Sequence, residues 1–245
     1  MAQGYPYSTG QATVDQVAVQ INAFMRRVYN WMAGGLALSG LVAWWVVSSP
    51  ATLGLFLRYD PASGTTSPTM LYWASLIGVF ALVMFLSAGI QRIRVGTATT
   101  LFLLYAGLNG VFLAPLLLMY TSASVFKAFI ITAGTFGVTS IWATTTKKDL
   151  SSWGSFLFMG LVGIIIASVV NMFLGSPMVD WIISWIGVGV FVGLTAYDTQ
   201  AIRAMYLQAA NEVTVSKMAI FGALKLYLDF LNLFLMLLRL FGERR

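Results

Sequence analysis

The sequence predicts an all-α, polytopic membrane protein, a bundle of seven transmembrane helices. Its 245 residues are 59% hydrophobic and only 9% charged, whereas a soluble domain carries about 25% charged residues. The apolar residues fall in blocks of about 20, the length that crosses a hydrocarbon core as a helix. No alternating strand pattern interrupts these blocks. We therefore expect one membrane domain, residues 24–245, after a polar N-terminal tail, residues 1–23.

The first four spans are bounded by polar or charged residues. We expect them at Tyr29–Val47, Thr69–Ile90, Val95–Met119 and Val125–Thr145. The pair Arg26-Arg27 precedes the first span, and the polar loop Ser48–Pro68 follows it. The second span ends at Gln91–Arg94 and the fourth at Lys147–Asp149. Charged residues at these points are typical of the membrane surface.

The last three spans are expected at Phe156–Leu174, Trp181–Ala201 and Met218–Phe241. The turn Gly175–Pro177 separates the first two of these, because glycine and proline interrupt helices. Trp31, Trp73 and other aromatic residues stand near span ends. That position is typical of an aromatic belt at the membrane surface rather than of a ligand site.

The distribution of basic residues predicts a cytoplasmic N-terminus. One side of the membrane would carry eight of them, namely Arg26, Arg27, Arg92, Arg94, Lys147, Lys148, Arg203 and Lys217. The other side would carry Arg58, Lys127, Asp60 and Asp180, and basic loops stay in the cytoplasm. We expect the last span to cross, although Arg239, Arg244 and Arg245 would then lie outside. The alternative is a final segment that turns back without crossing.

The composition also excludes several classes of chemistry. The chain has no cysteine and no histidine, so disulfides, zinc, haem and histidine proton relays are not expected. The net charge of +6 comes from basic residues at span ends, and we therefore expect no nucleic-acid partner. We expect no enzyme activity and no cofactor, and the expected surroundings are the lipid bilayer.

Two aspartates are the candidate functional residues. Of the acidic residues, only Asp198 and Asp229 fall within apolar spans, where a carboxylate costs about 2.5–3.5 kcal/mol on insertion scales. Asp198 lies roughly 10 Å and Asp229 roughly 18 Å from the cytoplasmic ends of consecutive spans, at 1.5 Å per residue. The two side chains could meet within one or two helical turns. Their protons would then belong to the pair, which could titrate near neutrality.

Other polar residues in the spans leave alternatives open. Lys225 precedes Asp229 by four residues, so the two could form an ion pair along one helix face. Asp198 could pair with Arg92, Arg94 or Arg203 at the cytoplasmic rim. Asn109 and Asn232 are candidate pathway residues, although hydrogen bonds between helices are the more common role of such side chains.

Two other seven-helix classes fit the residues less well. Microbial retinal proteins place an aspartate four residues before the retinal lysine, and here Lys225 precedes Asp229. Presenilin-like proteases pair Tyr-Asp with Gly-x-Gly-Asp on the next span. Tyr197-Asp198 matches the first half, but the residues before Asp229 contain neither glycine. A proton-coupled transporter is a third possibility, but the sequence shows no inverted repeat that would indicate one.

Four segments resemble the Bax inhibitor-1 family, the transmembrane Bax inhibitor motif proteins, and specifically a bacterial member. They are Tyr105–Gly110, Thr145–Leu150, Gly193–Gln200 and, most specifically, Gly222–Phe234, with Leu237–Arg239 behind it. The likeness extends from about Ala23 to the C-terminus. It implies a multi-pass protein of the bacterial inner membrane. It implies seven helices with the last one central, wrapped by the other six. It also implies a pH-sensitive calcium leak whose sensor is the pair Asp198 and Asp229.

The resemblance further implies a basic latch near the end of the second span, for which Arg92 and Arg94 are the candidates. Lys225 stands where the family pattern leads us to expect an uncharged residue, and it is a possible ion-pair modulator. Asp198 and Asp229 would bind calcium weakly and transiently, because Ca²⁺ prefers six to eight oxygen ligands. The alternative function is a non-conducting modulator of a partner complex such as a membrane-bound protease, docked through the N-terminal tail.

Overall fold

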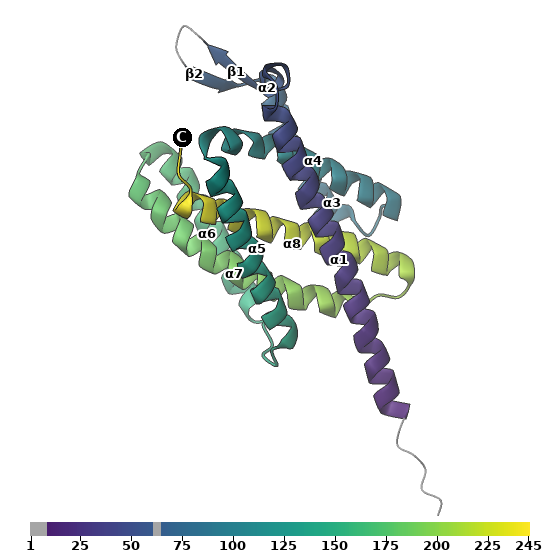
Figure 1. Cartoon of the computed structure of the whole chain (residues 1–245). Helices are drawn as coiled ribbons and strands as arrows, with labels where there is room; N and C mark the ends of the chain where they lie inside the picture. Colours follow the sequence, from purple (N-terminus) through teal and green to yellow (C-terminus); the bar gives the residue numbers. More distant parts are fainter. Residues whose placement is uncertain (1–8, 61–64) are drawn as a thin grey trace, which may run out of the picture.

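A computed structural model describes residues 9–60 and 65–245 of the chain (Figure 1). The elements are α1 (Thr9–Val47), α2 (Pro50–Phe56), β1 (Leu57–Asp60), β2 (Thr65–Pro68), α3 (Met70–Gly89), α4 (Val95–Met119), α5 (Ser122–Thr145), α6 (Trp153–Leu174), α7 (Pro177–Leu207) and α8 (Glu212–Phe241). Among the described residues, seven of these helices, α1 and α3 to α8, are long and apolar enough to cross a membrane. The predicted seven-helix, all-α fold is confirmed.

The segment between the first two spans is more structured than the polar loop expected there. The Ser49 side chain caps α2, whose first residue is Pro50, and both features favour a helix start. β1 and β2 then pair as an antiparallel hairpin with Leu57 opposite Pro68. At the other end of α1, helix begins at Thr9, so residues 9–23 of the predicted polar tail are helical. Residues 1–8 of that tail lie outside the described residues.

Local sequence signals define where several spans begin. The side chains of Thr69, Thr121, Ser176 and Asn211 accept hydrogen bonds from the first turns of α3, α5, α7 and α8. These hydrogen bonds satisfy backbone amides that a helix start leaves unpaired. The turn between α6 and α7 uses Gly175 at φ 61°, a left-handed conformation that glycine adopts without strain.

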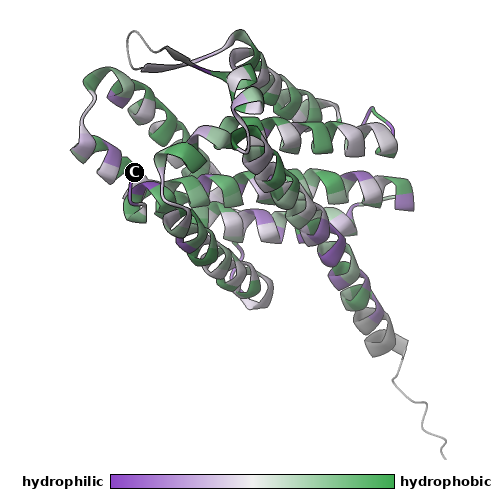
Figure 2. Cartoon of the chain, turned by 45° about the horizontal axis from the view of Figure 1, so that its top comes forward, coloured by the Kyte–Doolittle hydropathy of each residue, from purple (hydrophilic) through white to green (hydrophobic). Residues whose placement is uncertain are grey.

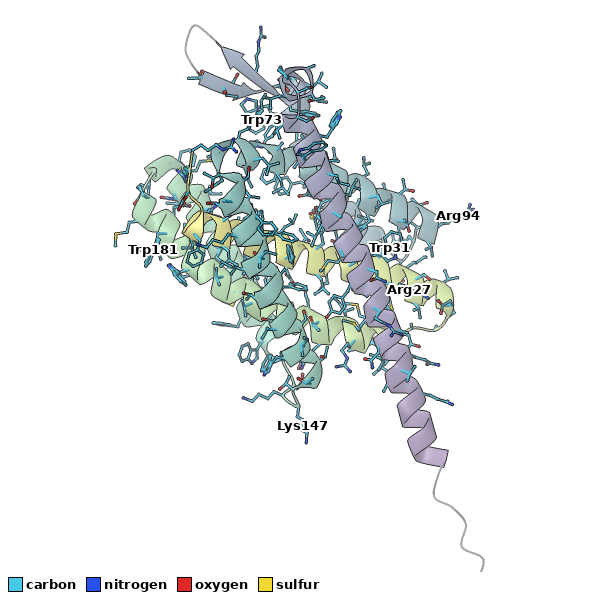
Figure 3. The ribbon with its side chains drawn as sticks, in the orientation of Figure 1. Arg27, Trp31, Trp73, Arg94, Lys147 and Trp181 are labelled. Atoms are coloured by element: carbon cyan, nitrogen blue, oxygen red, sulfur yellow. The ribbon has the colours of Figure 1, made fainter. Side chains whose placement is uncertain are left out.

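The bundle has two ends. At the basic end, Arg27 pairs with Glu212 at 2.8 Å, and Lys217 Nζ donates to the carbonyl of Gln91 at 3.0 Å. At the hairpin end, Arg239 pairs with Asp180 at 3.3 Å. Figure 3 shows Arg27 and Arg94 on the right of the bundle and Lys147 at the bottom, whereas Trp73 lies near the top and Trp181 on the left. α8 therefore runs from the basic end to the hairpin end.

α8 is the central helix, as the resemblance implied. It packs against α1, α4, α5 and α7. In its most apolar stretch of 18 residues, 72% is buried inside the protein, against 11% for the corresponding stretch of α6. α6 instead exposes large side chains such as Phe156, Met159 and Phe173. Hydrophobic residues, coloured green, extend along the helices of the bundle (Figure 2). A soluble protein seldom exposes so much apolar surface, and a bilayer accounts for it.

Candidate functional site

The interface of α7 and α8 contains the candidate site. The two helices run antiparallel in a register marked by three contacts along their length. A Cβ on Gly222 would lie 2.9 Å from Ile202, Lys225 meets Asp198, and a Cβ on Gly187 would lie 2.7 Å from Met236. Because the glycines lack a side chain, the two backbones can approach closely on both sides of the charged residues. This close packing positions Asp198 and Lys225 opposite each other.

Asp198 and Lys225 form an ion pair inside the bundle. Lys225 Nζ donates to Asp198 Oδ1 at 2.7 Å, with side-chain exposures of 31% and 10%. The distance is that of a charge-assisted hydrogen bond. The ion pair joins α7 to α8 within the membrane-spanning segments.

Asp229 completes a cluster of three charged residues. It follows Lys225 by one turn, about 6 Å along the helix axis, and is 5% exposed. The charges of Asp198 and Lys225 both act on it. Within the described part of the chain, its Oδ2 atom has no hydrogen-bond partner. Asp229 thus lies within electrostatic range of Asp198, and the group in contact with Asp198 is the Lys225 ammonium.

Two further buried hydroxyls, on helices that pack against α8, have no hydrogen-bond partner within the described part of the chain. They are Ser140 Oγ on α5 and Thr199 Oγ1 on α7, among the described residues. Thr199 follows Asp198 directly. Nearby, Gln200 donates to the carbonyl of Ala143, which is three residues after Ser140. Buried polar atoms are normally satisfied by protein or water, so unpaired atoms on α5, α7 and α8 mark this region as one that water or an ion could enter.

The candidate latch residues lie away from this cluster. Arg92 and Arg94 are exposed in the connection between α3 and α4 at the basic end, and Figure 3 shows Arg94 at that end. Arg203 donates to the carbonyl of Thr144 at 2.6 Å. The partner of Asp198 in this structure is Lys225.

The alternative that the sequence left open, an ion pair of Lys225 with Asp229, is not the one formed. Helical spacing allows it, but in the described structure the ammonium group reaches across to α7 and bonds Asp198. The lysine side chain is long enough for either carboxylate. The position of Asp198 opposite Lys225 decides between them.

The two asparagines do not bond between helices. Asn109 Nδ2 donates to the carbonyl of Tyr105 at 3.0 Å, and Asn232 Nδ2 donates to the carbonyl of Leu228 at 2.9 Å. Both acceptors lie four residues earlier on the same helix. Hydrogen bonding between helices, the more common role, is therefore not what these amide groups do in this structure.

A second polar contact, not predicted from the sequence, lies on the opposite face of α8. Ser39 Oγ lies 2.7 Å from the Tyr227 hydroxyl and 2.7 Å from the carbonyl oxygen of Ala106, and all three residues are buried. The contact joins α1, α4 and α8. A serine in the middle of an apolar span was the available signal, but serine is too common in spans to stand out.

Two of the family-like segments meet at the basic end. The Gln200 side chain accepts from the amide of Leu150 and donates to the carbonyl of Lys148. Beside them, Asp149 Oδ1 accepts from the amide of Ser151 at 2.9 Å. This hydrogen bond lowers the pKa of Asp149 below its ordinary value of 3.8, because it favours the charged carboxylate. The Gln200 contacts thereby tie the loop between α5 and α6 to α7, two residues from Asp198.

The cluster offers few ligands for a metal ion. Within residues 9–60 and 65–245, no group of three or more acidic, histidine or cysteine side chains could hold one. Asp198 and Asp229 could supply two carboxylates, and Lys225 already occupies one oxygen of Asp198. Ca²⁺ takes six to eight oxygen ligands. These residues therefore fit a brief contact with a passing cation better than a resident calcium site.

The fold and the site together define a polytopic membrane protein with a charged cluster buried against its central helix. Comparison with known proteins places the chain more narrowly: the family model described as inhibitor of apoptosis-promoting Bax1 matches residues 21–245. The chain belongs to this family, the Bax inhibitor-1 family, as its motifs indicated.

The relatives that it matches cover nearly its whole length. The chain is 45% identical to the inner membrane protein YbhL of Escherichia coli, over 95% of this chain and 97% of the relative. It is 42% identical to an uncharacterized protein of Deinococcus radiodurans, over 96% and 95% of the two chains. An uncharacterized protein of Rickettsia prowazekii is 40% identical over 92% and 91%. These relatives and the seven apolar helices support a multi-pass inner membrane protein.

Proposed function

We propose that this protein is a pH-sensitive calcium leak, gated by the protonation state of the cluster formed by Asp198, Lys225 and Asp229. The observation that carries the proposal is the buried, unpartnered carboxylate oxygen of Asp229 beside the Asp198–Lys225 ion pair. An ionisable residue inside a span is costly, and residues of this kind commonly mark ion or proton pathways.

The charge of the cluster sets the expected direction of the pH response. With both carboxylates ionised and the lysine protonated, the net charge of the cluster is −1, from two negative charges and one positive. Protonation of one carboxylate brings that charge to zero. A cation is attracted to the negative cluster and not to the neutral one. Calcium flux should therefore rise as the pH rises through the titration of the cluster.

The weak ligand set is compatible with conduction. An ion must bind well enough to enter a pathway and weakly enough to leave it. In this proposal Asp198 and Asp229 contact the ion briefly, and Lys225 acts as the latch. Negative charge on Asp229 competes with Asp198 for the ammonium group and loosens the contact between α7 and α8. Arg92 and Arg94, exposed at the basic end, have no part in this latch.

The test is calcium flux into proteoliposomes across a pH series from about 5 to 9, for the wild type and for Asp229→Asn and Asp198→Asn. We expect a leak that grows with pH in the wild type and a pH profile flattened by Asp229→Asn. The matched control is Asp149→Asn, which removes an exposed carboxylate between α5 and α6. A leak with the same pH profile in all variants would place the sensor elsewhere. No flux above empty liposomes at any pH would refute the leak.

A second candidate function is the non-conducting modulator of a membrane-bound partner. It is favoured by α1, whose N-terminal part extends beyond the rest of the bundle (Figure 1) and is exposed at residues 16–20. Deleting residues 1–20 should then abolish capture of the partner and leave any calcium flux intact. Loss of flux without loss of partner binding would argue against this role.

A further inference from the structure

An apolar groove opens on the side of the bundle opposite the charged cluster. It has a volume of about 500 Å³ and is lined by residues of α1, α4, α5 and α8. This volume falls within the range of about 300–1,000 Å³ that is typical of ligand sites. Its inner residues include Leu231 and Phe234, which are buried on α8. The groove therefore reaches the central helix.

The outer rim of the groove faces the bilayer. Trp44 and Phe126 line it and are 64% and 68% exposed, respectively. They lie on spans α1 and α5, on the outer surface that a bilayer covers. The molecules that can reach an opening at this depth are lipids, whose chains are as apolar as the lining.

One end of the groove is cationic. Arg245 and Ser122 line it at the hairpin end, and Arg245 Nη2 donates to Ser122 Oγ at 3.3 Å. No aspartate or glutamate side chain stands among the described residues that line the groove. Hydrogen bonds between the chain from Glu243 to Arg245 and residues Met119 to Ser124 hold this end in place. The side chains of Glu243, Arg244 and Arg245 together carry a charge of +1.

We propose that this groove binds one acyl chain of an anionic phospholipid, with the lipid phosphate on Arg245. A guanidinium group has five donors in a fork that matches phosphate, and the Ser122 hydroxyl lies beside it. Basic pockets between transmembrane helices bind anionic lipid headgroups in the same way. The proposal also accounts for arginine at the end of the bundle where basic residues are otherwise sparse. It does not depend on the leak.

The experiment measures lipid binding to the purified full-length protein by native mass spectrometry after removal of endogenous lipid. The probes are phosphatidylglycerol, phosphatidylcholine with the same chains, and oleate. We expect phosphatidylglycerol to bind at least about tenfold more tightly than phosphatidylcholine, a factor that corresponds to about 1.4 kcal/mol. Arg245→Gln should remove that preference. Arg58→Gln, at the hairpin, is the matched charge control.

A second variant tests the groove itself. Gly40 lines it, and a Cβ there would meet nothing within 4 Å, so this position has room for the start of a side chain and Gly40→Leu places a leucine in the groove. This substitution should weaken the binding of both phospholipids about tenfold, which again corresponds to about 1.4 kcal/mol. Gly163→Leu, on the exposed face of α6 with equally open space, is the control and should change neither. Thermal unfolding of both variants confirms that they fold.

Three results would overturn the proposal. If the two phospholipids bind equally tightly and Arg245→Gln changes neither affinity, the proposed contact of the headgroup with Arg245 is wrong. Oleate binding as tight as phosphatidylglycerol would identify a fatty-acid site instead. Unchanged binding in Gly40→Leu would show that the lipids attach elsewhere on the surface.

Discussion

Replacing Lys225 by methionine tests how strongly the buried ion pair holds α7 against α8. Methionine keeps most of the side-chain volume and removes the charge, so Asp198 is left without its partner. Breaking a fully buried pair in this way costs about 3–5 kcal/mol. Lys225 is 31% exposed and Asp198 10%, so solvent replaces part of the lost attraction. We therefore expect a loss of about 2–3 kcal/mol in the free energy of unfolding.

A double-mutant cycle separates the ion pair from packing. Asp198→Asn combined with Lys225→Met removes both charges and should restore at least half of the lost stability, because no unpaired charge remains at the Asp198 position. The assay is unfolding in detergent micelles, followed by helical content. Lys148→Met, at an exposed lysine of the loop between α5 and α6, should change the free energy of unfolding by less than about 0.5 kcal/mol.

The outcome that refutes this reasoning is additivity. If the double variant loses the sum of the two single losses, the charges do not interact, and the 2.7 Å contact contributes nothing to stability. A coupling energy of about 0.5–3 kcal/mol is the range for residues in contact. A value inside that range would support Lys225 as the residue that latches α7 to α8.

Three further predictions concern Gly110, Asp149 and Asp229. Gly110→Ala should cost about 1–3 kcal/mol in unfolding free energy, because its Cβ would lie 2.6 Å from the backbone oxygen of Ser39. Gly107→Ala, whose Cβ would have nothing within 4 Å, should not lower the free energy of unfolding. The lowered pKa of Asp149 means that its hydrogen bond stabilises the fold above the ordinary value of 3.8 and less as the pH falls below it. The difference in unfolding temperature between wild type and Asp149→Asn should therefore vanish in acid. Asp229→Leu should stabilise by about 1–3 kcal/mol, since it removes an unsatisfied buried group, and a decrease would contradict the absence of a partner for Oδ2.

The positions of the spans were predictable because length and hydropathy determine them. α4 has the predicted bounds, Val95–Met119. α7 and α8 extend several residues farther at the basic end than predicted. There the chain leaves the apolar layer while the helices continue, and hydropathy gives no signal for such extensions. The hairpin of β1 and β2 was missed for a related reason, since four-residue strands outside the apolar blocks are too short for a clear alternating pattern.

The pairing within the cluster could not be predicted in the same way. Helical spacing shows which residues share a face of one helix, so it suggested Lys225 with Asp229. The observed partner depends on the register between α7 and α8. That register is set by contacts such as Ile202 against Gly222, which involve residues far apart in the sequence. The hydrogen-bond partners of the two asparagines could not be predicted either, because the sequence places these residues in spans but does not determine the orientation of their amide groups.

The path of α8 is decided by packing rather than by the charges at its end. Basic residues usually stay in the cytoplasm, and a last span followed by Arg244 and Arg245 was therefore open to the interpretation that it turns back. In the structure α8 contacts α7 from Gly222 to Arg239, and its burial against four helices exceeds that of the other spans. Turning back would expose this surface and separate Lys225 from Asp198. Arg239 is paired with Asp180 at the hairpin end. This ion pair offsets part of the free-energy cost of placing a basic residue at that end of the bundle.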